Sequence, residues 1–414
     1  MAPPTADSAA LPLSGSDRFA RQRERILDAA TTLLNRHGLQ GMKFGDVARA
    51  LELTTTSVTY YFRYKEQLAA AVFEDSLSLL EAMAREASRQ STPQKRVARY
   101  LELYFDRHVE VLRRRVRPLA ILSEIRALEE PTRRPLIEHY QRIFRIVRGF
   151  FGSYDERGKS LFTARAQMLN EALFWSVAWL NQYAISDFGR VRRRMFDILE
   201  RGIAAPGADW APRVFDPDVS DAERTGRTAF LRVATRLINE IGYRGTSVER
   251  IAGELNLTKG SFYHHLNAKD DLILACFRDS FGRILRLREL VENEGATRWQ
   301  QLSSIIGSSL RVQFDGMHPL LRSTALQAMP AAVRDHALKL SNRTASCLAG
   351  MLADGIAEGR VRPIDPMIAS QMILSTINSA FDIRAWASRQ PGAEAIEIYA
   401  GTLARGIFDR ETGS

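Results

Sequence analysis

RILDAATTLLNRHGLQGMKFGDVARALELTTTSVTYYFRYKEQL, residues 25–68, and AFLRVATRLINEIGYRGTSVERIAGELNLTKGSFYHHLNAKDDL, residues 229–272, are two copies of one sequence pattern. The copies align without a gap at an offset of 204 residues. A shorter repeat at the same offset relates residues 199–203 (LERGI) to residues 403–407 (LARGI). Internal repetition of this kind predicts two related structural halves within one chain.

Each copy predicts a sequence of three short helices. Apolar residues at spacings of three and four place one buried face on the first helix, and Gly38 or Gly242 then supplies the left-handed residue that ends it. A second helix, a tight turn and a third helix follow. Ser247 is a predicted N-cap of the second helix in the second copy, and Thr54 and Thr258 are predicted N-caps of the third. Both copies therefore predict helix, tight turn, helix.

The third helix of each copy buries few residues and presents uncharged side chains that can form hydrogen bonds. Such a helix fits the major groove of DNA, where these groups can meet base edges and phosphates. Gly260 would let the backbone approach the duplex, and Lys65 and Lys269 suit phosphate contacts. We expect DNA contacts from Lys43, Thr54, Thr55, Thr56, Thr59, Tyr60, Tyr61 and Lys65, and from Ser247, Thr258, Lys259, Gly260, Ser261, Tyr263, His264, His265 and Lys269.

The second copy resembles the tetracycline-repressor (TetR) family through residues 242–248 (GYRGTSV), 257–266 (LTKGSFYHHL) and 268–272 (AKDDL). The resemblance implies DNA binding by the first three helices, a fourth helix leading to a ligand-sensing bundle, and dimerisation through the last two helices. The first copy departs from the pattern, because Thr56 replaces the glycine, Thr59 the tyrosine and Tyr61 the histidine. We expect it to bind DNA with an altered sequence preference, and a degenerate first copy remains the alternative.

The remaining periodic segments are helical, so the predicted fold is all-α. We expect a disordered tail over residues 1–17, helix-turn-helix domains over 18–66 and 226–272, and helical regulatory domains over 67–204 and 273–414. Residues 205–225 contain three prolines and mixed charge, which predicts a linker. A flexible linker would give the second DNA-binding domain a high effective concentration once the first is bound.

Two unlike DNA-binding domains in one chain predict an intramolecular pseudo-dimer on an asymmetric operator, because operator symmetry mirrors protein symmetry. We expect the late helices of the halves to pair, Leu161–Ala204 against Asp365–Phe408. Candidate interface residues are Leu161, Ala164, Met168, Ala172, Trp175 and Trp179, and Ile368, Met372, Ile377, Phe381 and Trp386. The alternative is a homodimer of double-length chains with four helix-turn-helix domains.

The regulatory domains contain aromatic and isolated polar residues that could line a ligand pocket. The candidates are Tyr104, His108, Tyr140, Phe144, Asn170 and Trp175 in the first half, and Phe314, His318, His336, Asn378 and Trp386 in the second. Core packing is the competing interpretation for each of them. The apolar character of these segments favours a largely apolar small-molecule effector, and repression is the direction of regulation that the resemblance implies.

The composition limits the other function classes. The net charge of +10 favours a polyanionic partner such as double-stranded DNA. No run of 18 apolar residues and no secretory signal is present, so we expect a cytoplasmic bacterial protein, associated with the nucleoid and not with a membrane. Cys276 and Cys347 lack metal-site spacing, and we expect neither a metal nor a cofactor. No catalytic motif is found, which argues against an enzyme, while a protein-interaction module without DNA binding remains the rival.

Overall fold

The computed structural model describes residues 15–153, 155–217, 226–256, 269–292, 296–322, 326, 329, 331–391 and 393–408. Over these ranges the chain is helical and contains no β-strand, which confirms the predicted all-α fold. An isolated bridge pairs Ala204 with Val361. None of the described helices combines the length and the apolar character needed to cross a membrane.

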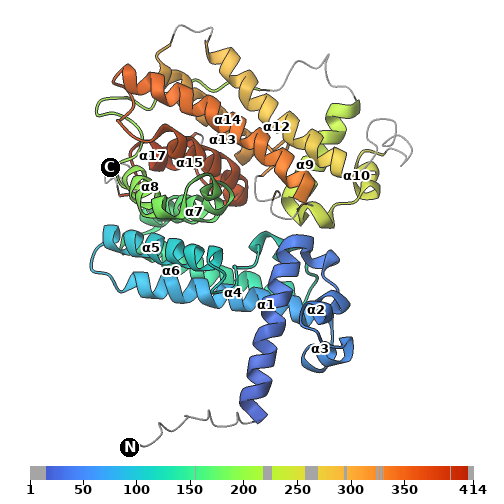
Figure 1. Cartoon of the computed structure of the whole chain (residues 1–414). Coiled ribbons are helices and arrows are strands. Elements are labelled where there is room, and N and C mark those ends of the chain that lie inside the picture. The colour runs from blue at the N-terminus through green and yellow to red at the C-terminus, as the bar shows by residue number, and fades with distance from the viewer. Residues whose placement is uncertain are drawn as a thin grey trace, which may run out of the picture.

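The first half of the chain, residues 15–204, begins with a long helix that projects past the neighbouring helices (Figure 1). This helix starts at Gly15, inside the segment that the sequence assigns to the disordered tail. The elements of this half are α1 (Gly15–Gly41), α2 (Phe44–Ala50), α3 (Thr55–Tyr61), α4 (Lys65–Ser88), α5 (Pro93–Leu112), η1 (Leu122–Ala127), α6 (Arg133–Arg148), η2 (Gly149–Phe151), α7 (Glu156–Trp179), η3 (Leu180–Gln182), η4 (Ile185–Asp187) and α8 (Phe188–Arg201).

The second half, residues 226–408, repeats this order of long and short helices where it is described. Its elements are α9 (Gly226–Gly245), α10 (Val248–Glu254), α12 (Lys269–Glu292), α13 (Arg298–Asp315), α14 (Ala331–Ala357), α15 (Pro366–Ala380), η7 (Phe381–Ile383), α16 (Arg384–Ala387) and α17 (Glu394–Ala404). The predicted third helix of the second copy falls within residues 257–268, which lie outside the described ranges.

The local signals of the repeat have the predicted geometry. Gly38 and Gly242 have φ angles of 61° and 79°, the left-handed region that glycine adopts without steric cost. Oγ1 of Thr54 accepts a hydrogen bond from the backbone N–H of Ser57, so Thr54 is the N-cap of α3. Ser247 caps α10 in the same way. These four predictions are confirmed.

The late helices of both halves meet in the middle of the molecule (Figure 1). The green helices α7 and α8 pack against the red helices α15 and α17, with α4–α6 on one side of this layer and α12–α14 on the other. The helix-turn-helix elements of both halves lie at one end of the molecule, away from the C-terminal helix α17.

A reciprocal contact joins the ends of α8 and α17. The backbone N–H of Ile203 donates to the carbonyl of Leu403 at 3.1 Å, and the N–H of Ile407 donates to the carbonyl of Leu199 at 2.8 Å. Each bond becomes the other when 204 is added to or subtracted from its residue numbers. The short repeated segments LERGI and LARGI therefore form backbone hydrogen bonds to each other, and the pair has local two-fold symmetry.

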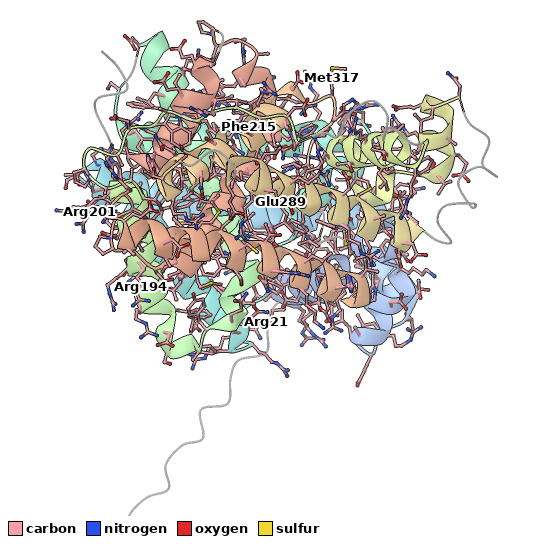
Figure 2. The ribbon with its side chains drawn as sticks, turned by 90° about the horizontal axis from the view of Figure 1, so that it is seen from above. Arg21, Arg194, Arg201, Phe215, Glu289 and Met317 are labelled. Atoms are coloured by element: carbon pink, nitrogen blue, oxygen red, sulfur yellow. The ribbon has the colours of Figure 1, made fainter. Side chains whose placement is uncertain are left out.

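The predicted flexible linker is wrong for residues 205–217, because this segment is bound to α13. The indole N–H of Trp299 donates to the carbonyl of Asp209 at 2.8 Å, and the indole rings of Trp210 and Trp299 pack edge to face. The N–H of Phe215 donates to Oγ of Ser308 at 2.9 Å, and the Phe215 ring packs on the hydrophobic core. Phe215 accordingly lies over the body of the molecule in Figure 2. Residues 218–225 lie outside the described ranges.

Candidate functional site

The first candidate DNA-contacting surface is the outer face of α3. Thr55, Thr56 and Tyr60 are exposed, with 75% of the Tyr60 side chain accessible to solvent. The hydroxyl of Thr59 donates to the carbonyl of Thr56 at 3.0 Å, so its free lone pairs can only accept a hydrogen bond. This face offers short hydroxyl groups and one large phenol, the kind of surface that can reach base edges.

The opposite face of α3 is held by apolar contacts. Val58 and Phe62 are buried, as the sequence predicts. Phe19, on the first turns of α1, packs against Tyr61 with ring centroids 4.6 Å apart, and the guanidinium of Arg23 lies 5.4 Å from the centre of the Phe62 ring. Tyr61 is therefore half-buried between α1 and the exposed face. The sequence analysis did not identify Phe19 as a support for α3, because it precedes the repeated segment.

Lysines flank these elements. Lys43 is exposed at the N-cap of α2, where no side chain caps the helix, and Lys65 is half-buried at the start of α4. In the second copy the ammonium group of Lys269 lies 4.5 Å from the centre of the Tyr243 ring, and Ser247 is exposed. The other second-copy candidates, Thr258, Lys259, Gly260, Ser261, Tyr263, His264 and His265, lie outside the described residues.

A cavity of about 690 Å³ lies between the halves. Four first-half candidates line it, namely Tyr104, His108, Tyr140 and Trp175, whereas Phe144 and Asn170 are not among its lining residues. The second half contributes Arg322, Leu326, Arg334, Leu338 and Asp382. The cavity wall is therefore composite, and neither half completes it alone.

The titratable first-half candidates are uncharged hydrogen-bonding groups. Burial raises the pKa of Tyr140 above its usual range, so its phenol stays protonated. Burial lowers the pKa of His108, whose ring stacks on Phe188 with centroids 5.8 Å apart. These side chains give the cavity polar contacts without added charge.

The second-half candidates occupy other places. Phe314 and Trp386 form an aromatic cluster with Tyr399, and the indole N–H of Trp386 donates to Oγ of Ser160 at 2.9 Å. The carbonyl of His318 accepts from Arg283, His336 is exposed on α14, and Asn378 is half-buried on α15. None of the five second-half candidates is among the residues that line the cavity.

A group of buried charges at the cavity wall was not identified from the sequence. Asp382 accepts hydrogen bonds from Arg126 at 2.7 Å and pairs with Arg322, and the Glu171 carboxyl faces the same group. Burial disfavours the charged form of Asp382, but the two arginines outweigh it and lower the pKa. Burial and the neighbouring Asp382 raise the pKa of Glu171. The group joins η1 and α7 of the first half to η7 of the second.

Element η1 connects this cavity to both helix-turn-helix domains. Leu122, Ser123, Ile125 and Arg126 of η1 line the cavity. Oε2 of Glu124 accepts from the backbone N–H of Leu39 at the end of α1, at 3.2 Å, and Arg126 also donates to the carbonyl of Asn239 on α9, at 2.8 Å. A movement of η1 would therefore reach α1 and α9 together.

The indole of Trp175 lies where the cavity meets the α7–α15 contact. Its N–H donates to Oε1 of Gln371 at 3.0 Å across the two halves. Arg362 donates to the Asp197 carboxylate and to the carbonyl of Gly202, which ties the start of α15 to the end of α8. The cavity and the pairing of the late helices thus share residues.

Comparisons with known proteins agree with this geometry. The family model described as "Bacterial regulatory proteins, tetR family" matches residues 26–72 and residues 230–276. The fatty acid metabolism regulator protein of Bacillus subtilis is 26% identical over 148 residues, which are 35% of this chain and 76% of that protein. The transcriptional repressor AcnR of Corynebacterium glutamicum is 23% identical over 195 residues, 44% of this chain and 95% of that protein.

Among solved structures, the transcriptional regulator FadR of Bacillus subtilis in complex with stearoyl-CoA is similar to part of this chain. It is 22% identical and matches 43% of this chain and 97% of its own, with a TM-score of 0.37. By their names, the two relatives described above are a regulator of fatty acid metabolism and a transcriptional repressor. The chain therefore contains the N-terminal helix-turn-helix domain of the TetR family twice, as expected of a tandem-duplicated regulator of that family.

Proposed function

We propose that this chain regulates transcription as a single-chain pseudo-dimer that binds an asymmetric operator. The observation that carries the proposal is the reciprocal pair of backbone hydrogen bonds between Ile203 and Leu403 and between Ile407 and Leu199. A two-fold contact between separate chains has this property, in which residue i meets j and j meets i. Here both partners belong to one polypeptide, which supports pairing of the halves within the chain.

The asymmetry of the operator is inferred from the unlike recognition segments. The first presents Thr55, Thr56, Thr59 and Tyr60 on α3. At the matched positions the second copy has Lys259, Gly260, Tyr263 and His264, which lie outside the described residues. Because different side chains prefer different base edges, the two half-sites should differ in sequence.

The first prediction concerns the mass and the footprint of the complex. We expect light scattering to give a particle of 46.7 kDa for the free chain, and one chain for each duplex selected from random sequence by the full-length protein. The selected duplexes should share one site with two unlike halves. A particle of twice this mass on a palindromic site would support the homodimer with four domains instead. Failure to select any duplex would favour the protein-interaction module.

We further propose that a largely apolar small molecule enters the composite cavity and regulates DNA binding. The lining is mainly apolar, and the cavity is large enough for a drug-sized or acyl ligand. The Bacillus subtilis relative is by its name a regulator of fatty acid metabolism, which supports an acyl ligand for this chain. Element η1 would carry the effect, because it lines the cavity and contacts both α1 and α9.

The second prediction tests the cavity with a neutral solvatochromic dye, Nile red. Ala178 lines the cavity and is half-buried, so Ala178→Trp should fill the space and weaken dye binding by about tenfold or more. Ala184→Trp is the control, because Ala184 is exposed and is not a lining residue. Saturating dye should also lower the affinity of the unmodified chain for its selected duplex. Equal dye binding by both variants would show that the cavity is not the dye site.

A further inference from the structure

Among the described residues that line the composite cavity, three have a buried side-chain atom without a hydrogen-bond partner, namely Nε of Arg107 on α5, Oγ of Ser123 on η1, and Nε of Arg322. Arg322 already pairs with Asp382 through another of its nitrogens. Buried donors are nearly always paired with protein, water or ligand, because an unpaired buried polar group is costly. Another nitrogen of Arg107, Nη2, donates a hydrogen bond to the carbonyl of Arg117 at 2.9 Å, which fixes the guanidinium at the cavity wall. Arg107 and Ser123 are therefore the two of these lining residues that have an unpaired buried donor and no carboxylate partner among the described residues.

The charged residues among the described lining indicate which charge the acceptor group of a ligand would have. Five arginines line the cavity against two carboxylates, Glu171 and Asp382. Arg126 and Arg322 pair with Asp382 and lie beside Glu171, so these four groups balance one another. Among the described residues no carboxylate forms an ion pair with the other lining arginines, Arg36, Arg107 and Arg334. The excess charge of the cavity is positive.

The remaining lining suits a hydrocarbon. Apolar and aromatic side chains from α4, α6, α7 and α14 surround the cavity, including Leu80, Ile137, Phe174 and Leu338. A ligand that satisfies both parts must have an apolar body and an anionic end. Arginine suits the anionic end, because its planar guanidinium forms strong charge-assisted hydrogen bonds with carboxylate or phosphate oxygens.

We propose that the effector is an amphipathic acid whose carboxylate or phosphate group is bound by Arg107 and Ser123. The inference rests on the proposed function, in which the composite cavity is the effector site. Arg36 and Arg334 add positive charge from α1 of the first helix-turn-helix domain and from α14 of the second half. Ser123 belongs to η1, so binding of the acidic group acts directly on the element that contacts both α1 and α9.

The third prediction compares decanoate, 1-decanol and decyltrimethylammonium as competitors of Nile red on the full chain. Decanoate should displace the dye about tenfold to hundredfold better than decanol, the difference that a charge-assisted hydrogen bond confers. Arg107→Gln should abolish this preference, Arg107→Lys should keep part of it, and Ser123→Ala should weaken it. Lys95→Gln, which removes an exposed charge from the same helix, should leave the preference intact.

Thermal unfolding of each variant separates a lost head-group contact from a lost fold, because Arg107 also holds the Arg117 carbonyl. Equal displacement by decanoate and decanol would overturn the acidic head group while leaving the cavity as the effector site. Preference for decyltrimethylammonium would place the head group at Glu171 and would overturn the inference as well. If Nile red binds equally to the unmodified chain and to Ala178→Trp, the proposed effector site itself fails.

Discussion

Replacing Gly202 with alanine is expected to separate the paired late helices of the two halves. Gly202 has a φ of +68°, and a Cβ at this position would overlap the backbone carbonyl of Ala404. Gly406, 204 residues later, has a φ of +95°, and its Cβ would overlap the carbonyl of Glu200. Backbone atoms cannot move aside as the end of a side chain can, so the junction must open.

The expected cost of Gly202→Ala is about 3 kcal/mol or more of unfolding free energy, the sum of left-handed strain and overpacking. Gly207→Ala is the matched control, because Gly207 also has a positive φ, +79°, but nothing lies near its added Cβ. Urea unfolding of both variants isolates the clash from the strain. If the two variants lose the same stability, the close approach of α8 and α17 does not hold the halves together.

The same substitution also tests how the halves cooperate on DNA. Opening the junction would let the two helix-turn-helix domains move independently, so the affinity for the two-part selected duplex should fall toward that for one half-site. Gly406→Ala should have a similar effect, because it disrupts the symmetry-related contact. The double variant should add little once the junction is open, since neighbouring sites in one contact are not additive.

The local geometry of the helix-turn-helix domains can be predicted from sequence because each signal acts over a few residues. The positive φ of Gly38 and the capping bond of Thr54 depend only on their own turns. In the second copy Gly242 repeats the positive φ, and Ser247 caps the second helix at the position where the first copy has Lys43 and no side-chain cap. Two copies with the same pattern are also stronger evidence for this local structure than one copy, since a chance resemblance would not preserve the spacing of turns and buried positions together.

The composite cavity cannot be predicted in this way. Arg126 and Asp382 lie 256 residues apart in sequence, and no local pattern relates them. The repeat is misleading here, because it suggests two equivalent pockets, one in each half. The aromatic residues that line the cavity described above all come from the first half, whereas its charged residues come from both halves. The ligand candidates of the second half, which are aromatic and isolated polar residues, lie in other packing environments.

The segment 205–217 shows how composition can mislead. Its prolines and mixed charge are typical of a linker, and the chain does run without a helix there. Trp210 and Phe215 were the available contrary signal, since large apolar side chains in a tether are costly to leave in water. Both side chains pack on the second half, so residues 205–217 form an extended segment bound to that half and not a free linker.

Replacing Asp382 with asparagine is expected to destabilise the contact between the halves by about 3–5 kcal/mol, because a buried ion pair that loses one partner leaves the other charge uncompensated. Here two arginines are left, Arg126 and Arg322, and the side chain of Arg322 is only 5% exposed. Asp354→Asn is the control: its carboxylate is 60% exposed and lies 3.5 Å from Arg298, so its loss should cost less than about 1 kcal/mol.

The pH dependence of this effect distinguishes lost charge from altered packing. The pKa of Asp382 is lowered in the folded chain from an ordinary value of 3.8, so its stabilising contribution is present above pH 3.8 and is lost as the pH falls through the folded-state pKa. The stability difference between the unmodified chain and Asp382→Asn, measured by urea unfolding, should therefore shrink in acid below pH 3.8. Near neutral pH the difference also contains the titration of Glu171, whose pKa Asp382 raises. A difference that persists unchanged into strong acid would mean that Asp382 acts through its shape, and that the two arginines do not depend on its charge.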